Sequence, residues 1–203
     1  MTGKIWMAVK GLWYYTIGHI FALFVYDKKY LKGKWFSGKA HGLCALGWKW
    51  VVHDAFARIG SSDNKDARFP VNQKCRVVCP ENIQFDPDDL NNFQSIGIYF
   101  QAIGKITIGK GTFLGPNVGL ITSNHDLLNP EQHLPPKEIT LGKACWIGMN
   151  SVILPGVVLG DHTVVGAGSV VTKSFPDGYC VIAGNPAKLI RRLEPNLEKL
   201  EEV

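Results

Sequence analysis

A histidine stands at the point where a regular repeat is interrupted. One block of the repeat ends in SNH (residues 123–125), and the next block begins only at Leu141, after the insertion DLLNPEQHLPPKEIT (residues 126–140). A long irregular insertion in an otherwise strict repeat is usually functional. An imidazole with an unperturbed pKa of about 6.5 is suited to take a proton from a hydroxyl at neutral pH. His125 is therefore the candidate general base.

The setting of His125 argues for more than a surface histidine. Asn124 stands at position five of its block, where other blocks carry a small or β-branched residue. Alternation along a strand points His125 outward, beside the base of the insertion. Asn124 and Asp126 are therefore candidate supporting residues. We expect His133, inside the insertion, and His162 to be incidental.

The repeat that carries His125 has a period of six. From Ile108 to Pro176 it reads IGKGTF, LGPNVG and LITSNH, then, after the insertion, LGKACW, IGMNSV, ILPGVV, LGDHTV, VGAGSV and VTKSFP. Position one is aliphatic in all nine blocks, position five is small or β-branched in seven, and position four is Gly or Asn in five. Positions five and one of consecutive blocks share a face in a strand, which we expect to point inward. Gly and Asn at position four tolerate a left-handed backbone at a corner.

A second period lies under the first. Position two is Gly in six blocks but Ile121, Leu154 and Thr172 in every third block. The repeating unit is therefore three blocks, which together make one coil. This pattern predicts an all-β solenoid of triangular coils, each stacked on the last at about 4.8 Å. We expect about five coils between residues 71 and 182, the first ones irregular.

Residues 1–70 form a basic, aromatic extension ahead of the repeat, which we expect to be mixed or helical. Residues 1–50 contain eight lysines, twelve aromatic residues and a single acidic residue, Asp27. The longest uncharged run, residues 11–26, is shorter than the roughly 20 residues that span a bilayer. Two alternatives remain open. The segment packs as helices and loops on the first coils, or residues 1–50 make peripheral contact with an anionic membrane.

The two ends of the repeat are expected to differ. Residues 52–75 are predicted to be a connector with little periodicity, and residues 183–203 a C-terminal tail and helix. The helix is predicted from the helical spacing of Leu189, Ile190, Leu193, Leu197 and Leu200. Packed over the last coil, it would cap an open sheet edge.

Composition indicates one domain with appendages, since 46% of the residues are hydrophobic and 19% are charged. The five cysteines form neither a CxxC pair nor a Cys/His cluster, so we expect no metal and buried, reduced thiols in a cytosolic protein. We expect a cytoplasmic location, or a peripheral one at the inner face of the plasma membrane. We expect no nucleic-acid partner.

The blocks resemble those of the hexapeptide-repeat acyltransferases. The likeness runs from the first regular block to the closing stretch AGNPAK (residues 183–188). It implies a left-handed parallel β-helix, acetyl-CoA as co-substrate, and a homotrimer with active sites between subunits. The galactoside, maltose and xenobiotic acetyltransferases of this family have a catalytic histidine just before a comparable loop, which matches His125.

The same resemblance implies a set of acetyl-CoA-binding residues. They are Trp146, Gly148, Met149, Ala167, Thr172, Lys173, Lys188 and Arg191. Gly and Ala would leave backbone amides open to the extended pantetheine arm. Lys173, Lys188 and Arg191 would meet the phosphates of the coenzyme.

The resemblance says less about the acceptor. The sugar-binding position of the galactoside enzymes falls near Tyr99 and Gln101, which do not reproduce it and are weak acceptor-binding candidates. We therefore expect an acetyl-CoA-dependent acyltransferase that acetylates a sugar hydroxyl of a cell-surface polysaccharide or lipopolysaccharide precursor. N-acetylation of an amino sugar is the alternative within this class. From other classes, a non-catalytic repeat scaffold would not need the coenzyme motifs, and a γ-type carbonic anhydrase would need three converging histidines.

Overall fold

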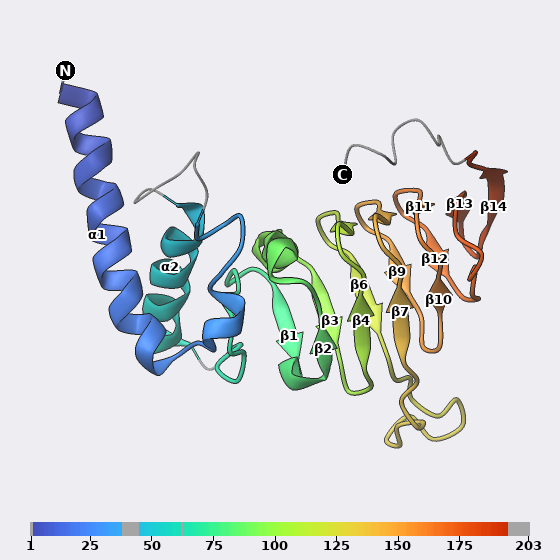
Figure 1. Ribbon diagram of the computed structural model, residues 1–203. Helices are drawn as coiled ribbons and strands as arrows, with labels where there is room; N and C mark the ends of the chain where they lie inside the picture. The colour runs from blue at the N-terminus through green and yellow to red at the C-terminus, as the bar shows by residue number, and fades with distance from the viewer. Residues whose placement is uncertain (1, 38–44, 62, 195–203) are drawn as a thin grey trace.

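The computed structural model describes residues 2–37, 45–61 and 63–194. It shows a helical N-terminal part beside one end of a β-solenoid (Figure 1). The helical part consists of α1 (Thr2–Phe24), the short 3₁₀ helix η1 (Lys28–Tyr30) and α2 (Leu46–Gly60). No helix among the described residues combines the length and apolar character needed to cross a membrane.

Three sheets form the sides of the solenoid. Sheet A contains β1 (Arg76–Val78), β3 (Tyr99–Gln101), β6 (Gly119–Ile121), β9 (Val152–Ile153) and β12 (Val170–Val171). Sheet B contains β2 (Ile83–Gln84), β4 (Ile106–Ile108), β7 (Ile139–Leu141) and β10 (Val158–Leu159). Sheet C contains β5 (Phe113–Leu114), β8 (Trp146–Ile147), β11 (Thr163–Val165), β13 (Cys180–Gly184) and β14 (Ala187–Arg192). The 3₁₀ helices η3 (Pro80–Asn82) and η4 (Pro87–Gln94) lie in the first coil.

The strand register confirms the three-block unit. Val170 pairs with Val152 and Val164 with Trp146, in each case in parallel and one three-block unit apart. Across the insertion the offset along the chain is larger, since Phe113 pairs with Trp146. The insertion therefore lengthens one coil without changing the register of the coils on either side.

The corners explain the residue types at position four. The backbone is left-handed at this position in the seven regular blocks, with φ between 51° and 86°: Gly111, Asn117, Ala144, Asn150, Gly156, His162 and Gly168. The predicted inward face is confirmed as well. All nine position-one side chains are buried, as are the seven small or β-branched side chains at position five.

Close contact between coils explains the glycines at position two. A Cβ added to Gly109 would lie 2.4 Å from the carbonyl carbon of Gly142 in the next coil. One added to Gly148 would lie 2.6 Å from the backbone nitrogen of Ala167. Real Cβ atoms do not approach backbone so closely, so these glycines are required by stacking.

The prediction that residues 52–75 are a connector is wrong for residues 52–60, which belong to α2. The buried face of this helix includes Asp54 and Arg58, whose polar character hides its helical period. Arg58 Nη2 lies 2.7 Å from Asp54 Oδ2, and the guanidinium also donates to the carbonyl of Phe69. Burial raises the pKa of the Asp54 carboxyl, and Arg58 opposes that rise. The pair attaches α2 to the chain that enters the first coil.

The predicted C-terminal helix is also wrong for the part of it that the structure describes. Leu189 and Ile190 lie in β14, which runs antiparallel to β13, and both are exposed. The outer edge of β13 carries backbone groups that a strand can pair with and a helix cannot. Leu197 and Leu200 lie outside the described residues.

We predict that Gly109→Ala destabilises the protein by about 1–3 kcal/mol, because the added methyl group forces two coils apart. Gly119→Ala is the matched control, since its Cβ would come no closer than 3.6 Å to Val152 side-chain atoms. Denaturant unfolding of both variants measures the difference. Equal midpoints for the two would contradict the stacking argument.

Candidate functional site

The insertion is an ordered hairpin that projects from the corner between sheets A and B (Figure 1). Its two sides pair through Lys137 N donating to Thr122 O, Leu134 N to Asn124 O, and Asp126 N to Gln132 O, each at 2.8 Å. Strand β7 resumes at Ile139, so the irregular part ends at residue 138 rather than at 140. His125 lies on the first side of this hairpin, close to the solenoid.

The hydrogen bond of His125 fixes its tautomer. Its Nδ1 lies 2.6 Å from the carbonyl oxygen of Pro130. A carbonyl can only accept, so Nδ1 carries the hydrogen in this contact. The neutral ring then has its lone pair on Nε2. An exposed imidazole with a basic Nε2 can accept a proton from a bound hydroxyl.

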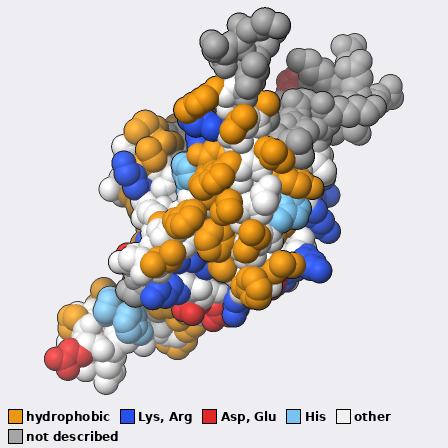
Figure 2. Space-filling model, turned by 90° about the vertical axis from the view of Figure 1, so that its left-hand side faces the viewer, with side chains coloured by type: hydrophobic (Ala, Val, Ile, Leu, Met, Phe, Trp, Pro, Cys, Tyr) orange, Lys and Arg blue, Asp and Glu red, His pale blue; other side chains and the backbone are white. Residues whose placement is uncertain are grey.

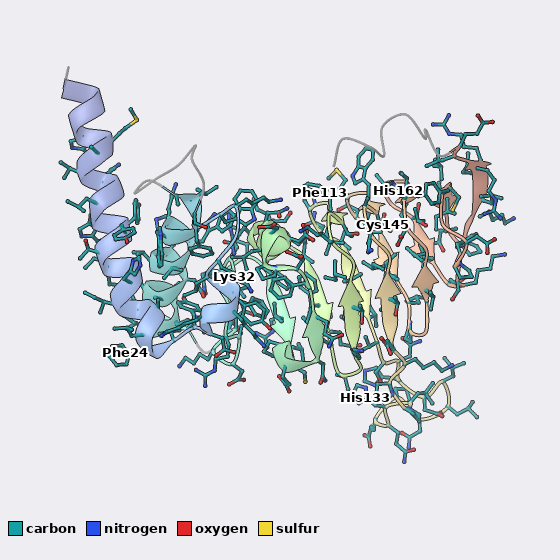
Figure 3. The ribbon with its side chains drawn as sticks, in the orientation of Figure 1. Phe24, Lys32, Phe113, His133, Cys145 and His162 are labelled. Carbon is teal, nitrogen blue, oxygen red and sulfur yellow. The ribbon has the colours of Figure 1, made fainter. Side chains whose placement is uncertain are left out.

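His133 lies against His125, although nothing in the residue pattern singled it out. The two residues face each other in an isolated antiparallel bridge, and their ring centroids are 4.1 Å apart. Figure 3 shows His133 in the projecting hairpin, away from the body of the solenoid. His133 therefore restricts the ring orientation of His125 from the opposite side of the hairpin. His162, by contrast, sits at a corner and stacks on Tyr179.

The two candidate supporting residues contribute to the hairpin rather than to the ring of His125. The Asp126 carboxylate accepts from the backbone N–H groups of Leu128 and Asn129 at 2.8 and 2.9 Å. These two hydrogen bonds lower the pKa of Asp126. Asn124 is exposed, and its backbone carbonyl takes part in the hairpin pairing.

Gln101, a weak acceptor-binding candidate from the sequence, positions the base of the hairpin in the structure. Its Oε1 accepts from the backbone N–H of Ser123 at 2.9 Å, and Ser123 Oγ donates to the carbonyl of Leu134. These bonds connect the preceding coil to both sides of the hairpin, just before His125 in the chain. Tyr99, on the same strand as Gln101, is partly exposed at 37%.

The candidate coenzyme residues occupy two regions of one chain. Trp146 on β8 is 60% exposed, and Met149 and Ala167 follow at the corner between sheets C and A. Lys188 and Arg191 extend this region along β14 on sheet C. The second region holds Thr172 and Lys173, which lie at the corner between sheets A and B, as His125 does. Within one chain, the structure brings only these last two to the same edge as His125.

Gly148 does not leave its amide open, contrary to the expectation for the glycines. Its N–H donates to Val165 O at 2.8 Å, and the residue is buried. Its role among the described residues is to allow coil stacking. The open surface beside it is provided by the exposed residues Trp146, Met149 and Ala167.

Cys145 points into the solenoid (Figure 3). Its side chain is buried, and burial is the main cause that raises its thiol pKa. A group in this position is unsuited to carry an acetyl group between substrates. Among the residues with described side chains, no cluster of three or more His, Cys, Asp or Glu could hold a metal ion.

Comparisons with known proteins agree with the repeat architecture described above. A family profile described as "Bacterial transferase hexapeptide (six repeats)" matches residues 138–173. The Saccharomyces cerevisiae protein named "Putative acetyltransferase YJL218W" is 41% identical over 143 residues, which cover 60% of this chain and 72% of that protein. The chain belongs to the hexapeptide-repeat transferases. This membership implies that the parallel coils form a left-handed β-helix.

Two further relatives of this hexapeptide-repeat transferase carry more specific names. The "Putative colanic acid biosynthesis acetyltransferase" of Escherichia coli K12 is 39% identical over 89 residues, 44% of this chain and 48% of that protein. The crystal structure of a maltose O-acetyltransferase from Clostridium difficile 630 has a TM-score of 0.51 and 32% identity, and the match covers 61% of this chain and 66% of that one. The chain spans about half the length of most of the curated relatives it matches.

We predict that Gln101→Ala loosens the base of the hairpin. Without the Gln101 acceptor, the Ser123 amide should exchange its hydrogen about 3–10 times faster, as expected for one lost hydrogen bond. Native-state hydrogen exchange measures this rate. Gln84→Ala, a change of an exposed glutamine on β2, is the control and should leave Ser123 unchanged. Unaltered exchange in Gln101→Ala would remove the positioning role.

Proposed function

We propose that this protein is an acetyl-CoA-dependent O-acetyltransferase that acts on a sugar hydroxyl, as part of the synthesis of a cell-surface polysaccharide or lipopolysaccharide. The observation that carries the proposal is the contact between His125 Nδ1 and the Pro130 carbonyl, which directs Nε2 of an exposed ring to act as the acceptor. The names of the maltose and colanic acid relatives support a sugar acceptor. The exposed residues of the coenzyme motif support the acetyl donor.

The reaction proposed is a direct transfer. His125 Nε2 takes the proton of the acceptor hydroxyl as its oxygen attacks the thioester carbonyl of acetyl-CoA. The new C–O bond forms, the C–S bond breaks, and the imidazolium returns its proton to the departing thiolate. His133 and the Pro130 carbonyl keep the ring in place. General-base catalysis of this kind typically contributes about 10²–10⁴-fold to the rate.

A homotrimer would complete the site. In one chain, His125 lies on the corner between sheets A and B, whereas Trp146, Met149 and Ala167 lie on or near the corner between sheets C and A. A threefold arrangement of triangular prisms can place the first corner of one subunit against the second corner of its neighbour. The catalytic base and much of the coenzyme surface would then come from different subunits.

We predict that His125→Ala lowers kcat by about 10²–10⁴-fold with little change in the KM for acetyl-CoA. Thiol release from acetyl-CoA, with nucleotide-activated and lipid-linked sugars as acceptors, measures the rate, and mass spectrometry identifies the product. Amino sugars in the same screen distinguish O- from N-acetylation. His162→Ala is the control. A kcat for His125→Ala equal to that of the unaltered protein would exclude the proposed base.

We predict that Lys173→Glu and Arg191→Glu each raise the KM for acetyl-CoA roughly tenfold or more, because each removes a charge-assisted contact to phosphate. Arg192→Glu is the matched control, since Arg192 pairs with Asp177 at 3.2 Å and is not among the proposed coenzyme residues. An unchanged KM would place the phosphates elsewhere.

The same variants test the shared site. Co-refolded mixtures of His125→Ala with Arg191→Glu should regain activity, because some subunit interfaces then combine two unaltered halves. Activity no higher than the sum of the separate variants would contradict a site between subunits.

A further inference from the structure

The outward face of α1 is apolar from Trp6 to Phe24. Figure 2 looks onto this face and shows a nearly continuous hydrophobic surface with basic side chains around it. Its main contributors are between 48% and 78% exposed: Trp6, Val9, Trp13, Ile20, Leu23 and Phe24. In Figure 3 the Phe24 side chain points away from the protein at the end of the helix. Single exposed apolar residues are ordinary, but a continuous face of this kind is typical of an interaction surface.

The polar residues on α1 do not interrupt this face. Thr16 Oγ1 donates to the Leu12 carbonyl at 2.9 Å, so the hydrogen bond of its hydroxyl is made within the helix. The Lys10 ammonium lies 3.7 Å from the centre of the Trp6 ring, at the border of the apolar face. The helix contains no acidic residue. The face could therefore enter an apolar medium without burying a carboxylate.

The opposite face of α1 packs on the protein. Gly18 lies so close to α2 that an added Cβ would be 2.9 Å from the Trp48 ring. Tyr14 and Tyr15, on the same side, are partly buried. In an isolated interfacial helix this second face would be polar and in water. In this protein that second face packs against α2 and does not need to be polar.

The charge around this surface is strongly basic. Residues 2–37 contain six lysines and one acidic residue, Asp27. Lys28 and Lys29 follow shortly after the end of α1 and are exposed, as is Lys49 on α2. Lysines beside an apolar, tryptophan-containing face match a bilayer surface that carries anionic lipids.

We propose that the outward face of α1 docks on an anionic membrane surface, with the helix lying in the interface rather than crossing it. The apolar side chains enter the boundary between headgroups and acyl chains, and the lysines contact the headgroups. This surface is distinct from the candidate active site, so the proposal does not depend on the reaction. It predicts a peripheral protein on the anionic cytoplasmic leaflet.

Docking in this way fixes the height of the candidate site. α1 lies at one end of the solenoid and runs across its axis (Figure 1). Helix layers are about 8–10 Å apart and coils about 4.8 Å, so His125, two coils beyond β1, stands roughly 20–30 Å from the lipid. An acceptor anchored in the same membrane would need a glycan long enough to cover that height.

Flotation of the full chain with vesicles tests the proposal. The protein should float with vesicles that mix phosphatidylcholine and phosphatidylglycerol, and less with phosphatidylcholine alone. Ile20→Asp/Leu23→Asp should reduce the bound fraction at least tenfold. Lys10→Glu/Lys49→Glu should weaken binding to the anionic vesicles by more than tenfold, at about fivefold per lysine removed from the surface. Circular dichroism confirms that each variant is folded.

Ile96→Asp/Ile103→Asp is the matched control, because these isoleucines are exposed on the solenoid by 54% and 38%. This variant should float as the unaltered protein does. Failure of the unaltered protein to float, or equal flotation of the α1 variant and the control, would overturn the proposal. Sedimentation in the absence of lipid gives a further test. An oligomer that Ile20→Asp/Leu23→Asp dissociates would also overturn the proposal, because the face would then bind a second copy of the chain.

Discussion

The structure depends on direct backbone contact between successive coils at their corners. Where position two is glycine, it meets the backbone of the next coil at a distance that excludes a side chain, as Gly109 and Gly148 show. Position four must turn left-handed to start the next side. With these two requirements met, each short strand aligns with its neighbours and the aliphatic residues stack inside. The geometry of every exposed residue on the solenoid follows from this spacing.

The backbone contact between coils also determines where the insertion begins and ends. Because the coils before and after it keep their register, the solenoid supplies two fixed ends, at Ile121 and Ile139. The hairpin between them needs only local bonds to hold its shape, and Gln101 attaches it to the preceding coil. A rigid base of this kind suits the role proposed for His125, which is held by contacts on both sides of the hairpin.

The sequence predicts the parts of the fold that repeat and misses the parts that do not. Core positions, corners and the size of the insertion follow from spacing alone. The second half of α2 is predicted as a connector, although residues 1–70 are expected to be mixed or helical, because Asp54 and Arg58 occupy core positions as a buried ion pair, which a hydrophobic pattern does not register. The structure of β14 escapes prediction because Leu189 and Ile190 have helical spacing by coincidence, whereas the free edge of β13 decides their conformation.

In the candidate site, too, some residues follow from the repeat pattern and others depend on the folded structure. His125 could be found because it stands where the repeat stops. His133 was missed, because its contact with His125 depends on how the hairpin pairs. One signal was available: the two histidines lie on either side of the turn sequence DLLNPE, at positions that a hairpin brings opposite each other. The role of Gln101 likewise depends on which residue the next coil places beside it.

Both ends of the solenoid are covered by elements other than α1. At the C-terminal end, β14 pairs with the outer edge of sheet C. At the N-terminal end, the buried side chains of α2 join those of the first coil in one core, and the Asp54–Arg58 pair attaches that helix to the chain beyond it. α2 therefore covers the first coil, and α1 lies outside it as a second layer. A helix that served only as an outer layer would be stable with polar residues on its solvent side. The exposed apolar residues of α1, from Trp6 to Phe24, are thus not explained by folding within the described chain, and a surface that takes them out of water accounts for them.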